Sequence, residues 1–495
     1  MRGRTLVNKA LLQIGVALFL TAATATAQDA STAIRNAEKT MGDAKSIRYS
    51  GSGRLGVVGM NWNPTGPWHT TVLNSYVRTI DYASGSSREL ITRNQENPPA
   101  LGGEAPFTDE IKEGHEVSGK YAWNQPGNAN PMPPPDVAVP ALATAEERTL
   151  QIYLTPHGFL KGALDNHATA KAENDGGKKV TVVTFMAGKH KIVGTIDSRN
   201  IVTSVNTWMA NPVLGDMPVE TNFYDYKDFN GVKFPMHIVQ KQGGSMTFDL
   251  NVSSVEPNVP NAALQVPDAV LHATIRPETA RSEKIADGVW FLHGGHDSVL
   301  IEFKDFLAVV EAPLDEARSI AVLAEVKKLV PDKPIKYVIN THHHFDHSGG
   351  LRTFVAEGAT VITQESNKAF FEWAWKQPRT IEPDRLSEKP REATFITYKN
   401  KYVLTDGSRN VEVHLLVGDM HDQFLSIVYM PKEQILIEAD DFSAWYITPL
   451  SLAMWNNLYG NLQRLNIEPE ILAPLHGDVT TMAIWLKSLR DSTAQ

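Results

Sequence analysis

The feature that most constrains this chain is a histidine-rich run directly after a buried-strand pattern. Residues 335–340 (IKYVIN) lead into Thr341-His342-His343-His344-Phe345-Asp346-His347-Ser348-Gly349-Gly350. In extended backbone, side chains two positions apart point to the same side, so we expect His342, His344 and Asp346 to converge, with His347 following where the chain turns. Imidazole and carboxylate are ligands that zinc accepts, and the chain has no cysteine. The run therefore favours a metal site over a solvated loop.

Three further strand-like runs end in residues of the same kind. Residues 411–417 precede Gly418-Asp419-Met420-His421, residues 434–440 (QILIEAD) end in Asp440, and residues 471–477 (ILAPLHG) end in His476-Gly477. Such strands alternate with helical patterns, of which residues 315–330 are the clearest. The alternation predicts a layered α/β domain.

The pattern His-x-His-x-Asp-His after a buried strand resembles the signature of the metallo-β-lactamase superfamily. The resemblance covers about residues 282–490 and implies an αββα sandwich at residues 280–490. It also implies the ligand set: His342, His344 and His421 for a first metal, Asp346, His347 and His476 for a second, and Asp440 as a bridge between them.

Four residues next to these ligands bear on the assignment. Ala439 stands where the family usually has glycine, and Asp441 follows Asp440 directly, which leaves Asp441 as an alternative bridge. Asp422 stands where a small hydroxylated residue is usual. His343 is expected to point away from the ligands.

The resemblance implies a dinuclear hydrolase with two zinc ions, iron or manganese being alternatives. The metals would share a water, lower its pKa and so provide the nucleophilic hydroxide, with Asp346 orienting it. A lactone, ester or thioester is the favoured small-molecule substrate, because true β-lactamases usually carry Cys or Ser at the bridging position. The alternatives are β-lactam hydrolysis, a mononuclear iron oxygenase on the same fold, and a periplasmic lipid- or acyl-binding protein with a structural metal.

Two further segments are candidates for the site's surroundings. His293 and His296 flank a Gly-Gly loop, which in this family often rims the active site and is here equally consistent with an ordinary surface turn. Trp445 and Tyr446 follow the bridging acid and are candidates for a substrate wall or for simple packing.

Residues 28–275 are expected to form a mainly antiparallel β domain. Short β-rich runs fill residues 178–254, separated by turns at Asn230-Gly231 and Gly243-Gly244. The pattern weakly resembles the curved sheets of periplasmic lipoprotein carriers, which implies a lipid or acyl ligand. A domain that caps or dimerises the enzyme is the favoured interpretation. The proline-rich residues 255–280 are the best linker.

The start of the chain is typical of an export signal. Residues 1–27 carry three early basic residues, an uncharged apolar run at 10–24 and a small-residue site at 25–27. We therefore predict a cleaved signal peptide and a periplasmic or secreted protein of a Gram-negative bacterium. The formal net charge of −9 and the lack of a basic run argue against a nucleic-acid partner, and the sequence gives no oligomeric state.

Overall fold

A computed structural model describes residues 30–103, 107–125, 137–442 and 449–493. The predicted signal peptide, Trp445 and Tyr446 lie outside these described residues. Within the described ranges, no helix has the length and apolar character that a membrane span requires.

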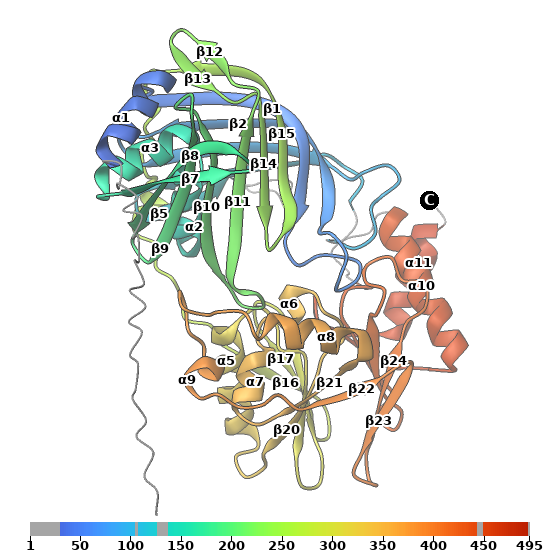
Figure 1. Cartoon of the computed structure of the whole chain (residues 1–495). Helices are drawn as coiled ribbons and strands as arrows, with labels where there is room; N and C mark the ends of the chain where they lie inside the picture. Colours follow the sequence, from blue (N-terminus) through green and yellow to red (C-terminus); the bar gives the residue numbers. More distant parts are fainter. Residues whose placement is uncertain (1–29, 104–106, 126–136, 443–448, 494–495) are drawn as a thin grey trace, which may run out of the picture.

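The first half of the chain forms a strongly curved antiparallel sheet (Figure 1). Among the described residues it has 13 strands in the order β6-β5-β4-β3-β2-β1-β15-β14-β11-β10-β9-β8-β7. The strands are β1 (Ser46–Val57), β2 (His69–Asp81), β3 (Ser86–Asn94), β4 (Ile111–Ser118), β5 (Tyr121–Gln125), β6 (Val139–Pro140), β7 (Thr169–Asp175), β8 (Lys178–Ala187), β9 (His190–Asp197), β10 (Val202–Asn211), β11 (Gly215–Tyr224), β14 (His237–Gln242) and β15 (Ser245–Pro257). The predicted antiparallel β domain is therefore present.

Tight turns account for much of this sheet's regularity. Asn230 and Gly231 take positive φ angles of 55° and 87° between the paired strands β12 (Lys227–Phe229) and β13 (Val232–Phe234). Gly243 and Gly244 do the same, at 59° and 90°, between β14 and β15. Both predicted hairpin turns use residues that tolerate this backbone conformation at low cost.

Helices not anticipated from the strand-like sequence pack on the sheet. They are α2 (Ala145–Tyr153) and α3 (Pro156–Asp165), which accompany α1 (Ala30–Met41), a short 3-10 turn (Leu142–Thr144) and α4 (Asp268–Leu271). Thr155 caps α3 by accepting a hydrogen bond from the Gly158 amide, and Pro156 occupies its first turn. These local signals start the helix, and its buried face, which includes Phe159 and Leu160, joins the sheet's core.

The concave side of the sheet holds a cavity of about 360 Å³. Aromatic and aliphatic side chains line it, but so do the charged residues Arg78, Glu89, Glu147 and Arg148. Arg78 and Glu89 form an ion pair, with Nε and Oε1 3.2 Å apart. The lining is therefore amphipathic and contains charge.

The second half of the chain forms two stacked sheets. The first has the order β16 (Arg281–Ala286), β17 (Val289–His293), β18 (Ser298–Glu302), β19 (Leu307–Val310), β20 (Ile335–Ile339), β21 (Thr360–Gln364) and β22 (Phe395–Tyr398). The second has the order β23 (Lys401–Thr405), β24 (Asn410–Leu415), β25 (Ser426–Met430), β26 (Ile435–Glu438), β27 (Ile471–Pro474) and β28 (Thr480–Thr481). The helices of this half are α5 (Glu316–Leu329), α6 (Phe345–Ser348), α7 (Leu351–Ala356), α8 (Glu365–Ala374), α9 (Arg385–Glu388), α10 (Pro449–Leu465) and α11 (Met482–Thr493).

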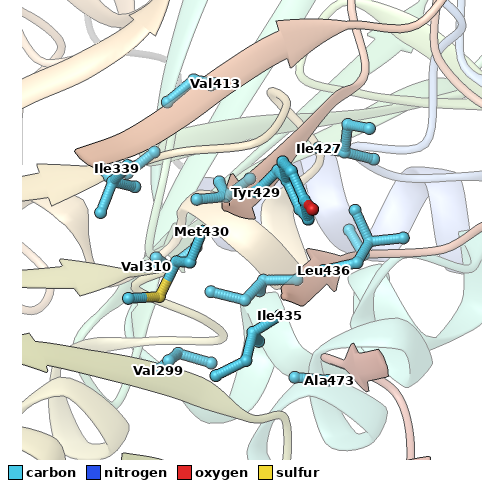
Figure 2. Packing of buried hydrophobic residues seen from close by; sticks show 14 of the residues in the cluster. Val299, Val310, Ile339, Val413, Ile427, Tyr429, Met430, Ile435, Leu436 and Ala473 are labelled. Carbon is cyan, nitrogen blue, oxygen red and sulfur yellow. The ribbon is translucent and has the colours of Figure 1, made fainter. Parts of the chain in front are cut away.

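Alternating side chains show how the layers stack. In β18, Val299 and Ile301 join the core between the two sheets, whereas Leu300 joins the core under the helices that include α5 and α7. Figure 2 shows the inter-sheet core, where Val310 and Ile339 lie near Met430 and Ile435. Each such buried aliphatic side chain stabilises the fold by roughly 1.5–3 kcal/mol. Because Trp455 and Trp485 cover the second sheet from α10 and α11, the order of layers is αββα, as predicted.

The two halves pack against each other through apolar and polar contacts. Trp68 and Met217 of the curved sheet share a core with Phe345 and Leu351 of the sandwich. Arg379 also donates hydrogen bonds to the carbonyls at positions 211, 212 and 213. The antiparallel domain is therefore positioned directly over the edge of the sandwich near α6 (Figure 1).

Candidate metal centre

The strands of the sandwich bring the predicted ligands to one edge. His342 and His344 follow β20, and Asp440 and His476 follow β26 and β27, which run parallel to each other. His421 follows β24, which runs in the same direction as β26 because β25 lies antiparallel to both. The carboxyl ends of these strands therefore meet at one place, as in other sheets whose ligands come from strand ends.

Three histidines form the first cluster. The ring centroids of His344 lie 4.6 Å from His342 and 4.5 Å from His421, and all three residues are buried. His342 Nε2, His344 Nδ1 and His421 Nε2 have no hydrogen-bond partner among the described residues. The second ring nitrogen of two of these histidines has a hydrogen-bond partner: His342 Nδ1 lies 3.0 Å from Thr341 Oγ1, and His344 Nε2 lies 2.9 Å from the Asn61 carbonyl oxygen. Each ring therefore has one free nitrogen for a cation.

The second cluster contains Asp346, His347 and His476, and the structure adds His296 to it. His347 Nε2 and His476 Nε2 are 2.8 Å apart. Asp346 Oδ2 lies 3.5 Å from His347 Nε2 and 3.6 Å from His476 Nε2. His296 Nδ1 is 3.7 Å from the same oxygen. One ligand atom of each residue lies within 4.8 Å of the others, which is the spacing that a shared cation requires.

Asp440 lies between the clusters. Its Oδ2 is 3.4 Å from His342 Nε2 and 3.5 Å from His421 Nε2, both of the first cluster. The same oxygen is 3.1 Å from His347 Nε2, and Oδ1 is 3.2 Å from His476 Nε2, both of the second. One carboxylate therefore contacts histidines of both clusters, which is the position of a bridging ligand.

Asp441 occupies a different environment. Burial, together with the negative charge of Asp419, raises the pKa of Asp441 well above its ordinary value. For Asp440, burial also acts to raise the pKa, but His421, His347 and His476 hold it well below the ordinary value. The geometry thus favours Asp440 over Asp441 as the bridge, while the ligand assignments themselves stay predictions.

The histidines of the two clusters also differ in the direction in which their pKa values are shifted. Burial lowers the pKa of His342 well below its ordinary value, and burial lowers that of His344 to about 3. Burial also acts to lower the pKa of His347, but Asp440, Asp346 and Glu311 raise it well above the ordinary value. Neutral imidazole is the form that binds a metal, so His342 and His344 are already in that form near neutral pH.

Two buried acids, Glu311 and Asp422, contact histidines at or next to the site. Glu311 Oε2 lies 2.8 Å from His347 Nδ1, which turns His347 Nε2 toward Asp440. His343 Nδ1 lies 2.5 Å from Asp422 Oδ2, so this nitrogen faces Asp422, while the His343 ring also packs edge-on against His344 with centroids 5.1 Å apart. Carboxylates that accept from a ligating histidine fix its tautomer and ring orientation.

The structure corrects one step of the sequence argument. Extended backbone ends at His344, and Asp346 and His347 lie in the short helix α6. Asp346 therefore enters the site from a helical turn instead of from strand alternation. Gly349 and Gly350 permit this turn to pack closely, since a Cβ would lie 1.8 Å from the Leu314 carbonyl oxygen and 1.9 Å from Ser319 Oγ, respectively.

Three residues at the site were missed or left open by sequence reasoning. His296 was one of two histidines at a loop of undecided role, and its partner His293 contacts Glu283 instead of the clusters. Glu311 follows the strand-like run FLAVV, a signal of the same kind as that of Asp440. Asn61 lies in the other domain, and no local pattern marks it.

The donor set fits divalent metal ions. Buried imidazoles and carboxylates converge in two groups, and the free atoms identified above face one another across short distances. Oxygen and nitrogen donors of this kind suit zinc, iron and manganese.

One comparison with known protein families identifies a superfamily for part of the chain. A family model described as the Metallo-beta-lactamase superfamily matches residues 293–429. The chain therefore contains a domain of that superfamily, which confirms the predicted superfamily and its class of metal-dependent hydrolases.

Individual relatives are more distant. The linear primary-alkylsulfatase of Pseudomonas sp. (strain ATCC 19151) is 41% identical over 58 residues, which is 12% of this chain and only 11% of that relative. Among solved structures, a metallo-beta-lactamase from Pontibacter korlensis has 18% identity and a TM-score of 0.35, covering 44% of this chain and 100% of its own. The flavodiiron protein from Giardia intestinalis has 16% identity and a TM-score of 0.34, covering 44% of this chain and 60% of its own.

Proposed function

We propose that this chain is an exported dinuclear metal-dependent hydrolase that cleaves a carbonyl-containing bond, with a lactone, ester or thioester as substrate. The observation that carries the proposal is the position of Asp440. Its carboxylate contacts His342 and His421 on one side and His347 and His476 on the other. A structural metal site is usually closed and mononuclear, and needs no such bridge.

The chain's own residues have distinct roles in this proposal. His342, His344 and His421 would hold one cation, and Asp346, His347 and His476 the other, with zinc as the expected metal. Bound cations of this kind supply a Lewis acid and lower the pKa of water toward neutrality. Asp346 Oδ1 has no partner among the described residues, so it is available to accept a hydrogen bond from the attacking water. Buried walls around the clusters strengthen these electrostatic interactions.

The substrate class rests on the bridging carboxylate. The Cys or Ser that β-lactamases usually carry at this position is replaced by Asp440, which favours lactone, ester or thioester cleavage over β-lactam cleavage. The alkylsulfatase relative adds a sulfate ester as a second candidate, on the strength of its 41% identity over 58 residues. Both candidates keep the same metal ligands.

The antiparallel domain is assigned a capping role in this proposal. The charged groups Arg78, Glu89, Glu147 and Arg148 in its cavity lining make the cavity less suited to an acyl chain than an apolar cavity would be, because covering a charge with hydrocarbon removes its contact with water. Its contacts with the edge of the sandwich support a cap over the metal centre. Export to the periplasm or beyond rests on the signal-like residues 1–27.

The test is an activity panel on the zinc-loaded protein with a lactone, an aryl ester, a thioester, a β-lactam, an alkyl sulfate and a phosphodiester. We expect the fastest turnover on one of the first three. Asp440→Ala should lose at least about 100-fold in kcat/KM, since it removes a ligand shared by both cations. Equal activity of Asp440→Ala and the parent would refute the bridge, and preferred cleavage of the alkyl sulfate would favour the second candidate. No turnover of any substrate by protein with two bound zinc ions would contradict the hydrolase proposal.

A further inference from the structure

A loop of the antiparallel domain reaches the first histidine cluster. The connection between β1 and β2 carries Asn61, whose side chain and backbone are buried with only 1% of the residue exposed. The Asn61 carbonyl oxygen lies 2.9 Å from His344 Nε2. A carbonyl oxygen can only accept, so His344 Nε2 carries the proton and donates it. The Nδ1 of His344 is then the lone-pair nitrogen, and it is the atom without a partner among the described residues.

The Asn61 side chain contacts the neighbouring histidine. Asn61 Oδ1 lies 3.1 Å from His343 Nε2 and accepts its hydrogen bond. The amide is held in that orientation because Asn61 Nδ2 donates to the Asn63 carbonyl oxygen at 2.5 Å. His343 in turn contacts Asp422, the residue that departs from the family pattern. Asn61 therefore holds both His343 and His344, one through its side chain and one through its backbone.

Trp62, the next residue in this loop, bonds the backbone on both sides of His421, the third member of the first cluster. Trp62 Nε1 donates to the Asp419 carbonyl oxygen at 3.1 Å, and the Trp62 carbonyl oxygen accepts from the Gln423 amide at 2.7 Å. These two hydrogen bonds lie on either side of His421 in the sequence. They fix the turn that presents its ring.

Close packing sets the distance between the loop and the helix that carries Asp346. Gly59 has φ of 81°, and a Cβ at this position would lie 2.3 Å from the Phe345 ring. Trp68, at the end of the loop, packs edge-on against the same ring, with centroids 5.7 Å apart. The segment is thus held against the sandwich by apolar contacts as well as by hydrogen bonds.

We propose that residues 59–62 of the antiparallel domain position the first metal's ligands, with Asn61 holding His344 in its metal-binding tautomer and Trp62 holding the turn of His421. The inference rests on the dinuclear centre of the proposed function. It gives the antiparallel domain a role beyond capping, because residues of this domain hold the metal ligands of the other domain in place. Asn61 and Trp62 are positioning residues: Asn61 contacts the ligand His344, and Trp62 contacts the backbone of Asp419 and Gln423, on either side of the ligand His421.

The test compares Asn61→Ala with Asn63→Ala, a matched control in the same loop whose side chain bonds only Thr65 among the hydrogen bonds described. Both stepwise zinc dissociation constants are measured by competition with a chromogenic chelator, and the apo proteins are unfolded thermally in EDTA. Asn61→Ala keeps the backbone carbonyl but removes the side-chain bonds to His343 and to the Asn63 carbonyl, which hold that carbonyl against His344. We therefore expect it to weaken one zinc constant by about 10-fold and to leave the other within about threefold, because orienting partners of a ligand typically contribute 10–100-fold in affinity. Asn63→Ala should leave both constants within about twofold.

A second variant keeps the test decisive if Asn61→Ala does not fold. Trp62→Phe retains an aromatic ring and loses the bond to Asp419, and it should weaken the same constant by about threefold. In the cobalt-substituted protein, either variant should alter the visible d–d spectrum of one site. Unchanged constants and spectra in both variants, or an equal weakening of both constants together with a lower apo unfolding temperature, would overturn the inference. A parent protein that binds fewer than two metals would instead count against the proposed function.

Discussion

Glu311 accepts a hydrogen bond from His347, with Oε2 and Nδ1 2.8 Å apart and both side chains buried. The other oxygen of Glu311 accepts from the Thr341 amide at 2.6 Å. One carboxylate thus links the strand end that carries the first cluster to a ligand of the second. His347 Nε2 is left facing Asp440 and His476.

Glu311→Gln is expected to weaken zinc binding at one site by about 10–100-fold. A glutamine amide must present NH₂ either to the Thr341 amide or to His347 Nδ1. The first choice places two donors together, and the second puts the imidazole proton on Nε2, where it blocks metal binding. Chelator competition measures the constant, and an unchanged value would show that Glu311 does not orient His347.

Arg318→Met should destabilise the sandwich by about 3 kcal/mol, because it removes three hydrogen bonds and leaves the buried Leu292 carbonyl oxygen without this donor. The buried guanidinium of Arg318 donates to the carbonyls of His296, Thr279 and Leu292. Urea unfolding measures the change. The matched variant Arg385→Met removes a surface ion pair to Glu357 and should cost under about 0.5 kcal/mol. Equal effects of the two variants would contradict the role of the buried hydrogen bonds.

The antiparallel domain should lose stability as the pH falls below about 6.5, the ordinary pKa of histidine. Burial lowers the pKa of His157 to about 4. Between these two pKa values His157 is protonated in the unfolded chain but neutral in the folded chain. Its contribution to the free energy of unfolding is therefore complete above about pH 6.5 and is lost as pH falls toward 4. It amounts to ~2 kcal/mol between pH 7 and pH 5.

His157→Gln tests this pH dependence. Chemical unfolding at several pH values should give a flatter profile for His157→Gln than for the parent, whereas His272→Gln, at an exposed position, should keep the parent's profile. Parallel profiles for the parent and His157→Gln would rule out His157 as the titrating group.

Separate substitutions of Asp440 and Asp441 should show which of these two acids is the bridging ligand. Asp440→Asn is expected to weaken both zinc constants by more than about 10-fold, because the carboxylate contacts both clusters. Asp441→Asn should change either constant by less than about threefold, since Asp441 lies outside both clusters and burial disfavours its charged form. The reverse order of effects would move the bridge to Asp441.

The sequence was most informative where local pattern and chemistry coincide. The family resemblance implied His421, Asp440 and His476 at the ends of strand-like runs, and these residues lie close together in the fold because strand direction in a sheet determines where its ends lie. The alternation of strands and helices predicted a layered α/β domain, and the family resemblance implied its αββα order. The helix at residues 345–348 was missed because it is a single turn, too short for a periodic signal.

Contacts between distant segments could not be predicted. Asn61 precedes His343 by 282 residues, and its burial against the histidines depends on how two domains dock. His296 lies in a loop whose sequence fits a surface turn equally well. The pairing of His343 with Asp422 also needed the fold, since each residue alone suggested only a departure from the expected pattern.

The central claim is that Asp440 joins two histidine clusters into one dinuclear centre. Metal content per chain, determined by plasma mass spectrometry after zinc loading and dialysis, tests it most directly. The account predicts two zinc ions in the parent protein and fewer than two in Asp440→Asn. One iron and no zinc per chain, or two tightly held zinc ions in Asp440→Asn, would contradict it.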